Sequence, residues 1–125
     1  MDMPDWVASV NPCDADCPSR DLLDLIGDRW SLLIMLVIGQ GFHRNGEIRR
    51  RVGGISQKML TQTLRQMERD GLLTRTVHPV VPPRVDYALT PLGNSLSAAF
   101  CGVWIWAERN LDMVEAARAR FDARG

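Results

Sequence analysis

The sequence predicts a mainly α-helical protein of one domain that carries a small β-hairpin. Its 125 residues are enough to form one hydrophobic core but too few for two domains of usual size. Apolar residues recur at helical spacing in short segments that glycines separate, and the pattern becomes β-branched and alternating only between residues 73 and 89. We therefore expect a single domain over residues 1–125, with an irregular arm at 1–16, a core at 17–90 and helices at 91–121.

The first two helices are predicted at residues 21–26 and 30–38. Both segments are rich in apolar residues and free of proline, and glycines at positions 27, 39 and 41 interrupt the pattern. In the second segment the apolar residues fall at i, i+3, i+4, i+7 and i+8: Trp30, Leu33, Ile34, Val37 and Ile38. This spacing predicts a helix face that packs in the core.

A pair of short helices with a glycine turn between them is predicted next. Asn45 is expected to cap a helix that runs to about Val52, and Gly53 and Gly54 then form the turn. The following helix, residues 56–70, should start with Ser56 as its N-cap and end before a C′ glycine at position 71.

The helix at residues 56–70 has two different faces. Its apolar residues Leu60, Leu64 and Met67 share one face by their spacing. Its long polar residues cluster on the opposite side: Lys58, Gln62, Arg65 and Arg69. We expect the apolar face to pack in the core and the polar face to be free.

A hairpin and further helices complete the chain. Strands are predicted at residues 73–78 and 85–89, with a proline-rich loop at 79–83. Thr90 is expected to cap the next helix, with Pro91 at its first position. This helix should run to about residue 108, and residues 111–121 should form another.

Charge is unevenly distributed along the chain, although the net charge is zero. Residues 44–84 contain nine Lys or Arg and three Asp or Glu, whereas the rest of the chain contains six basic and twelve acidic residues. A basic centre between acidic ends is typical of a surface that faces nucleic acid.

The order of elements indicates a DNA-binding motif. A helix, a glycine turn, a helix with a polar outer face and then a hairpin describe a winged helix-turn-helix, with the hairpin at 73–89 as the wing. The second helix would enter the major groove, where Gln side chains bond adenine and Lys or Arg side chains bond guanine or phosphate. In the wing, Arg84 would contact the neighbouring phosphates or minor groove.

Three stretches of the chain also resemble a known family. They are CPSRDLLDLIGDRWSLLI, GEIRRRVGGISQKMLTQTLRQMERDGLL and HPVVPPRVDYALTPLG, and they resemble the HxlR-type winged helix-turn-helix regulators, which are related to the MarR group. The resemblance implies a homodimeric transcriptional regulator, with repression as the default, whose N- and C-terminal helices make the dimer. Its two recognition helices would bind successive major grooves of a pseudo-palindromic double-stranded DNA operator.

The resemblance assigns DNA contacts only to positions that keep the family's pattern. These positions are Ser56, Gln57, Lys58, Thr61, Gln62, Arg65 and, in the wing, Arg84. One departure is Asn45, where relatives usually carry an aromatic residue.

Cysteines near the N-terminus are candidates for a redox switch. The resemblance implies that Cys17 senses oxidants or electrophiles, and Cys13 could resolve the oxidised thiol as a disulfide. Arg20 favours a Cys17 thiolate, whereas the aspartates at positions 14, 16 and 21 oppose it. Cys101, within the apolar C-terminal helix, is expected to be a small core residue.

Two other kinds of site remain open alternatives. A metal site could combine Cys13 and Cys17 with His43 or His78, although the spacing matches no familiar zinc pattern. The aromatic residues Phe100, Trp104 and Trp106 are expected in the dimer core, because the first two lie at i and i+4. Alternatively, they line a pocket for a small aromatic inducer.

Several classes are excluded or disfavoured. No catalytic or phosphate-loop motif is present, so we expect neither an enzyme nor a cofactor. The longest apolar stretch, residues 32–38, is far shorter than the roughly 20 residues that span a bilayer, and the acidic start lacks a secretory leader. We expect a cytoplasmic protein. A winged helix used only for protein interaction is the alternative of a different class.

Overall fold

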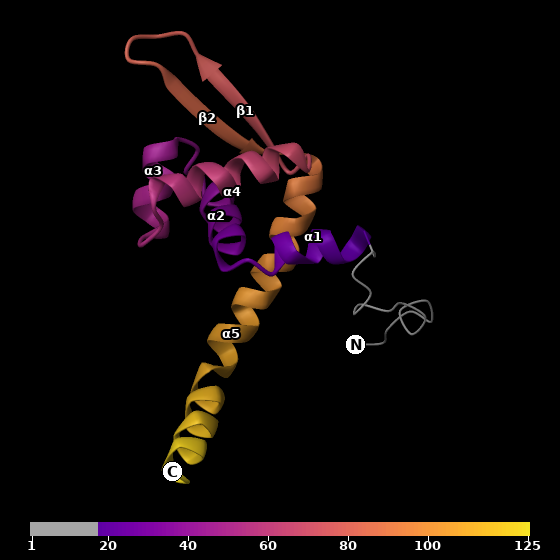
Figure 1. Cartoon of the computed structure of the whole chain (residues 1–125), viewed down its shortest axis with the longest axis vertical. Helices are drawn as coiled ribbons and strands as arrows, with labels where there is room; N and C mark the ends of the chain where they lie inside the picture. The colour runs from indigo at the N-terminus through magenta and orange to yellow at the C-terminus, as the bar shows by residue number, and fades with distance from the viewer. Residues whose placement is uncertain (1–17) are drawn as a thin grey trace.

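The computed structural model describes residues 18–125 as a group of helices with one hairpin and one long helix. The elements are α1 (Pro18–Ile26), α2 (Arg29–Gly39), α3 (Asn45–Val52), α4 (Gln57–Arg69), β1 (Leu73–His78), β2 (Arg84–Leu89) and α5 (Pro91–Ala123). Figure 1 shows α2, α3 and α4 grouped beside the hairpin, while α5 passes α1 and then projects away from the other elements. The predicted mainly helical fold with one hairpin is confirmed.

The core lies around α2, which packs against α1, α3, α4, α5 and β2. On the predicted face of α2, Ile34, Val37 and Ile38 are buried, while Trp30 and Leu33 are partly buried. The largest fully buried apolar side chains come from three helices: Ile34, Met35, Ile48, Leu60, Leu64 and Met67. The two helices joined by the glycine turn, α3 and α4, are therefore fixed to α2 by their apolar residues.

Both ends of α4 are set by local bonds that the sequence predicts. The Oγ of Ser56 accepts a hydrogen bond of 3.0 Å from the backbone N–H of Met59, as an N-cap does. Gly71 follows the helix with a φ of 78°, a conformation that glycine adopts without strain. Both predictions are confirmed.

The predicted cap of α3 is wrong by one residue. Asn45 is the first residue of the helix, and the N-cap position is Arg44, whose side chain makes no capping bond. Arg44 is held in an extended conformation because it forms an isolated antiparallel bridge with Asp86 of β2. This long-range pairing fixes the start of α3. Helix α1 also begins earlier than the predicted residue 21, at Pro18.

The hairpin is antiparallel, and its register runs from Leu73 opposite Leu89 to His78 opposite Arg84. The second strand begins at Arg84, one residue before the predicted start. Residues 79–83 form the connecting loop, so the wing predicted at residues 73–89 is present.

Helix α5 starts as predicted but does not end as predicted. The Oγ1 of Thr90 accepts a bond of 3.0 Å from the Gly93 N–H and donates one of 2.6 Å to the Gly71 carbonyl. The prediction of two C-terminal helices is wrong, because α5 continues without a break to Ala123. No glycine or proline lies between residues 103 and 123, and Asn110 stays helical while its Nδ2 donates to the Trp106 carbonyl at 2.8 Å.

Two neighbouring residues of α5 have environments opposite to those expected. Phe100 is 3% exposed and packs in the core of its own chain, rather than against a second subunit. Cys101 is exposed, so the prediction of a core thiol is wrong for the single chain. Successive residues on a helix point about 100° apart, so a helix at the edge of a core buries one and exposes the next.

Candidate nucleic-acid interface

Helix α4 buries its apolar face and presents its polar face to solvent. Leu60, Leu64 and Met67 are 0% exposed. The predicted DNA-contacting residues of the helix and its cap are all exposed: Ser56, Gln57, Lys58, Thr61, Gln62 and Arg65. Arg69 and Glu68 extend this exposed face. The two-faced helix predicted from the sequence is confirmed, whereas the role of each exposed residue stays a prediction.

Polar bonds within this face affect which atoms are free. The Nε2 of Gln57 donates to the Thr61 Oγ1 at 3.1 Å, one helical turn later. The Ser56 Oγ accepts the capping bond described above, so its hydroxyl proton remains able to donate to another acceptor.

Arg65 of α4 borders a hollow between this helix and the hairpin. Together with Thr61 and Glu68 of α4, it lines a shallow hollow that Arg75 of β1 and Tyr87 of β2 complete on the hairpin side. Two guanidinium groups, from Arg65 and Arg75, therefore border the same hollow between helix and wing. Arg75 could not be predicted from the sequence, because only the folded hairpin brings it next to α4.

The helix before the glycine turn adds a second basic surface. Arg49, Arg50 and Arg51 are exposed near the C-terminus of α3, where positive charge also suits the helix dipole. Gly53 and Gly54 then take positive φ values of 70° and 77°, which lets the chain turn tightly into α4.

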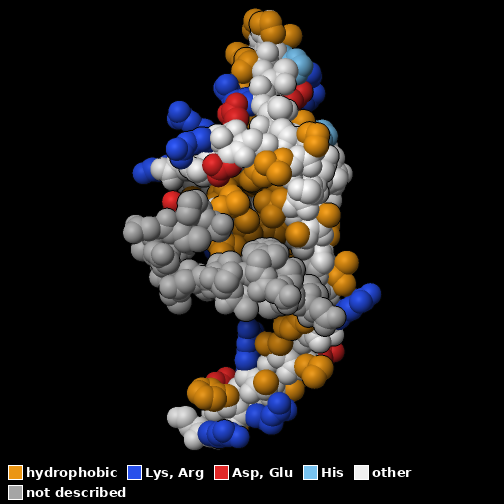
Figure 2. Space-filling view, turned by 90° about the vertical axis from the view of Figure 1, so that its right-hand side faces the viewer, with side chains coloured by type: hydrophobic (Ala, Val, Ile, Leu, Met, Phe, Trp, Pro, Cys, Tyr) orange, Lys and Arg blue, Asp and Glu red, His pale blue; other side chains and the backbone are white. Residues whose placement is uncertain are grey.

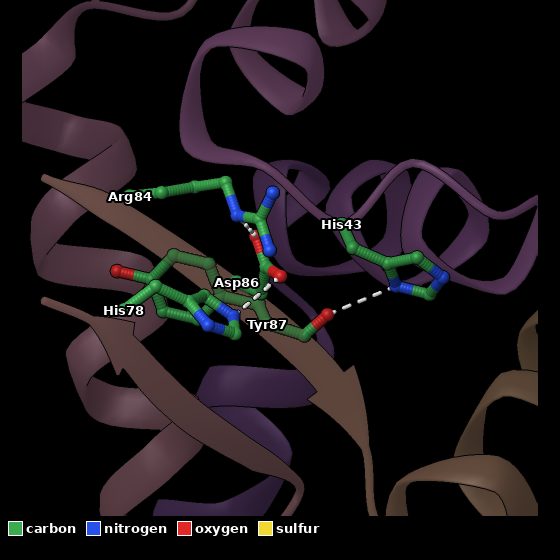
Figure 3. A network of polar contacts seen from close by, with 5 residues as sticks. All are labelled: His43, His78, Arg84, Asp86 and Tyr87. Carbon is green, nitrogen blue, oxygen red and sulfur yellow. Dashed lines mark hydrogen bonds and ion pairs between the residues drawn. The ribbon is translucent and has the colours of Figure 1, made fainter. Parts of the chain in front are cut away.

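The wing contains a small polar network, which Figure 3 shows. The Asp86 carboxylate lies between two basic side chains: its Oδ2 is 2.9 Å from the His78 Nε2, and its Oδ1 is 3.5 Å from the Arg84 Nε. Arg84, the predicted wing contact, is thus partly buried and paired inside the wing. Its positive charge is partly offset by Asp86, a pairing that depends on the hairpin register and could not be predicted from the sequence.

One backbone bond and one contact of the His43 ring attach this wing to the segment before α3. The Tyr87 N–H donates to the His43 carbonyl at 2.8 Å, and the His43 Nδ1 lies 3.0 Å from the Tyr87 carbonyl oxygen (Figure 3). The wing and the first helix of the motif are therefore held together as one unit beside α4.

The described residues include only some of the cysteine and histidine candidates. Cys13 and Cys17 lie outside the described residues, whereas Cys101 is exposed on α5. His78 is engaged with Asp86 and His43 with a backbone carbonyl. Within residues 18–125 no group of three or more His, Cys, Asp or Glu side chains could hold a metal ion. No helix in this range is long and apolar enough to cross a membrane.

A polar helix, a preceding helix joined to it by a glycine turn and a hairpin beside both define a DNA-binding protein of the winged helix-turn-helix class. Comparison with known proteins identifies the branch of that class. The sequence matches the HxlR-like helix-turn-helix family over residues 25–115, and the chain belongs to this family.

Relatives and solved structures agree with this assignment. The chain is 46% identical over 102 residues to the uncharacterized HTH-type transcriptional regulator YtfH of Escherichia coli (strain K12), which covers 82% of this chain and 81% of the relative. It is similar to the solved structure of the transcriptional regulator ytfH from Salmonella typhimurium, with a TM-score of 0.82, 44% identity and coverage of 87% and 97% of the two chains. It is also similar to the redox regulator HypR in its reduced form, with a TM-score of 0.72, 37% identity and coverage of 80% and 99%. The chain is thus a transcriptional regulator of the HxlR type.

Proposed function

We propose that this chain is a transcriptional repressor that binds, as a homodimer in the cytoplasm, to a pseudo-palindromic operator in double-stranded DNA. The observation that carries the proposal is the exposed polar face of α4, which lies beside the wing and follows the exposed arginines of α3 across the glycine turn. A helix of this kind fits the major groove, and the nearby cations suit the phosphates that border the groove.

Individual roles follow from side-chain chemistry. Gln57 and Gln62 carry amides that bond adenine edges, and Lys58 and Arg65 bond guanine or phosphate. The Gln57 bond to Thr61 presents these two side chains as a preformed pair. Ser56 supplies a hydroxyl proton for a phosphate oxygen, and Arg84 with Arg75 adds wing contacts to the backbone.

The projecting part of α5 supports the homodimer. Apolar residues follow a regular four-three spacing along the helix, interrupted by one polar residue: Leu96, Phe100, Val103, Ala107, Asn110, Val114, Ala117 and Phe121. This is the repeat of a helix that pairs with another helix. Leu96 and Phe100 already pack in the chain's own core, whereas Val103 and Phe121 are 54% and 74% exposed. The seam from Val103 onward is therefore open to a second copy.

Helix α1 adds to the same apolar surface. Leu22 and Leu23 are 47% and 53% exposed, and Leu22 borders a hollow with Leu92 and Leu96 of α5. Figure 2 shows hydrophobic side chains gathered on this face and along the projecting helix. Exposed apolar surface of this extent favours association between protein chains.

The proposal is tested by DNA binding with a matched pair of variants. Arg65→Ala should reduce the ratio of affinities for promoter DNA and random DNA, because Arg65 reads a base. Arg109→Ala, which removes an exposed arginine from α5, should leave the ratio unchanged. Equal weakening on both DNAs would reduce Arg65 to a phosphate contact, and no binding of the intact protein to its own promoter at low salt would refute the proposal.

The switch of this repressor is proposed at Cys17, and similarity to the redox regulator HypR supports it. Peroxide would oxidise the Cys17 thiolate to a sulfenic acid and be reduced to water. The Cys13 thiol would then displace a second water molecule and form a disulfide. If peroxide or diamide changes operator affinity equally in the parent protein and in Cys17→Ser, this assignment is wrong.

A winged helix that binds only proteins is a weaker candidate. Such a module would present apolar residues on the outer face of α4, because interface cores are depleted of charged residues. The face instead carries Lys58, Gln62, Arg65 and Arg69.

A further inference from the structure

An apolar hollow of about 460 Å³ lies between α2 and α5, next to the end of α3. Leu33 and Leu36 of α2 form one wall, and Cys101, Trp104 and Ile105 of α5 form the other. Small-molecule sites in proteins usually measure about 300–1,000 Å³ and are lined mainly by apolar side chains with a few polar groups. The hollow has the size and lining of such a site.

The walls of the hollow are incompletely covered by the chain itself. Trp104 and Ile105 are each 46% exposed, and Leu33 and Leu36 are only partly buried. Covering apolar surface is favourable, and an indole ring offers a flat face on which another ring stacks. The hollow therefore favours a flat, apolar group.

The hollow and the proposed dimer seam use different faces of α5. The open seam begins at Val103 and continues through Ala107, whereas Trp104, which lines the hollow, follows Val103 by one position. One residue along a helix corresponds to a rotation of about 100°. A second copy on the seam would thus leave the hollow accessible.

Among residues 18–125, one charged side chain lines the hollow, that of Arg51 near the end of α3. Its guanidinium carbon lies 5.2 Å from the centre of the Phe42 ring. No acidic side chain of residues 18–125 forms an ion pair with it. A guanidinium without a carboxylate partner beside an apolar cavity is complementary to an anion, and its planar fork matches a carboxylate.

We propose that this hollow binds a small aromatic carboxylate. Its ring would lie between Trp104 and the leucines of α2, and its carboxylate would pair with the Arg51 guanidinium. The occupant must be both flat and anionic, because the walls are apolar and the one ionised group among the described residues that line them is a cation. An apolar neutral molecule would use the walls but leave the Arg51 guanidinium without an anion.

The site would give the proposed repressor a small-molecule input. Arg51 belongs to the first helix of the DNA-binding motif and precedes the glycine turn into α4. A ligand held by Arg51 and by α5 would connect that helix to the proposed dimer helix. This step alone rests on the proposed function, and the binding test below contains no DNA, so the two can fail separately.

The test is a calorimetric titration of the full chain with 2-naphthoate and with its neutral analogue 2-naphthamide. The carboxylate should bind about 10- to 100-fold more tightly than the amide. This is the gain in affinity that hydrogen bonds to a charged group usually provide. Arg51→Met keeps an apolar stem and should abolish this preference. Arg50→Met changes an adjacent exposed arginine that does not line the hollow, and it should preserve the preference.

A second readout, which does not depend on Arg51, is the rate at which iodoacetamide alkylates Cys101. Mass spectrometry of the peptide that contains Cys101 measures this rate. Saturating 2-naphthoate should slow modification of Cys101 at least several-fold. The proposal is overturned if neither probe binds at millimolar concentration, or if Arg51→Met and Arg50→Met behave alike. It is also overturned if Cys101 of the ligand-free protein reacts only after denaturation, since a second copy would then fill the hollow.

Discussion

Replacing Asp86 by asparagine should strengthen non-specific DNA binding while weakening the choice of operator. In the wing, the Asp86 carboxylate lies 3.5 Å from the Arg84 Nε and 2.9 Å from the His78 Nε2. The amide keeps the shape of the side chain and can still bond His78, but it no longer attracts the guanidinium. Arg84 is then free to contact a phosphate.

The expected magnitude follows from one additional phosphate contact. Each contact adds about 0.9 to the slope of log K against log salt, so between 50 and 200 mM salt the variant should lose roughly 3.5-fold more affinity than the parent. Phosphate contacts carry no sequence information, so the ratio of operator to random affinity should fall. The fold should survive, because an ion pair whose side chains are about one-third exposed contributes at most about 1 kcal/mol.

Fluorescence anisotropy with labelled operator and random duplexes over a salt series measures both quantities. Asp112→Asn makes the same chemical change on the exposed surface of α5 and serves as the control. The reasoning is refuted if the salt slope of Asp86→Asn equals that of Asp112→Asn, because Arg84 would then be equally available in both proteins.

Three further substitutions test the fold around the DNA-binding face and the dimer. Ser56→Ala removes the capping bond to Met59 and should lower the free energy of unfolding by about 1 kcal/mol in urea titration; an unchanged midpoint would contradict the cap. Gly93→Ala should cost about 1–3 kcal/mol although alanine favours helices, because its Cβ would overlap the Leu72 carbonyl oxygen; a stabilised variant in the same titration would show that the contact relaxes freely. Val114→Lys places a charge in the apolar seam of α5 and should yield monomers in sedimentation equilibrium, and persistence of the dimer would move the interface elsewhere.

Features of the fold that depend on local bonds could be predicted from the sequence. The start of α4 depends on a hydroxyl and an N–H three residues apart, and its end depends on a glycine at positive φ. Both are recognisable because the interacting groups are close in the chain. The buried face of α4 was likewise predicted, since it needs only the helical repeat.

Features that depend on distant residues could not be predicted in the same way. Arg44 takes the N-cap position of α3 because it pairs with Asp86, which is 42 positions later. The partial neutralisation of Arg84 depends on the hairpin register, and the approach of Arg75 to Arg65 depends on packing of the hairpin against α4. For α5, an apolar helix rich in aromatics does not reveal whether Phe100 or Cys101 faces the core.

Helix α5 connects the proposed input to the proposed output. Its first turn is fixed to the wing side of the motif, where Thr90 bonds Gly71 and Gly93 lies against Leu72. Its middle borders the hollow that holds Arg51, and its 33 residues span about 50 Å, so that its end reaches well beyond the core. In the proposed dimer, the angle between α5 and α2 sets the separation of the two α4 helices, which must match half-sites about 34 Å apart. A ligand bound between α2 and α5 would act on this angle and so on that separation.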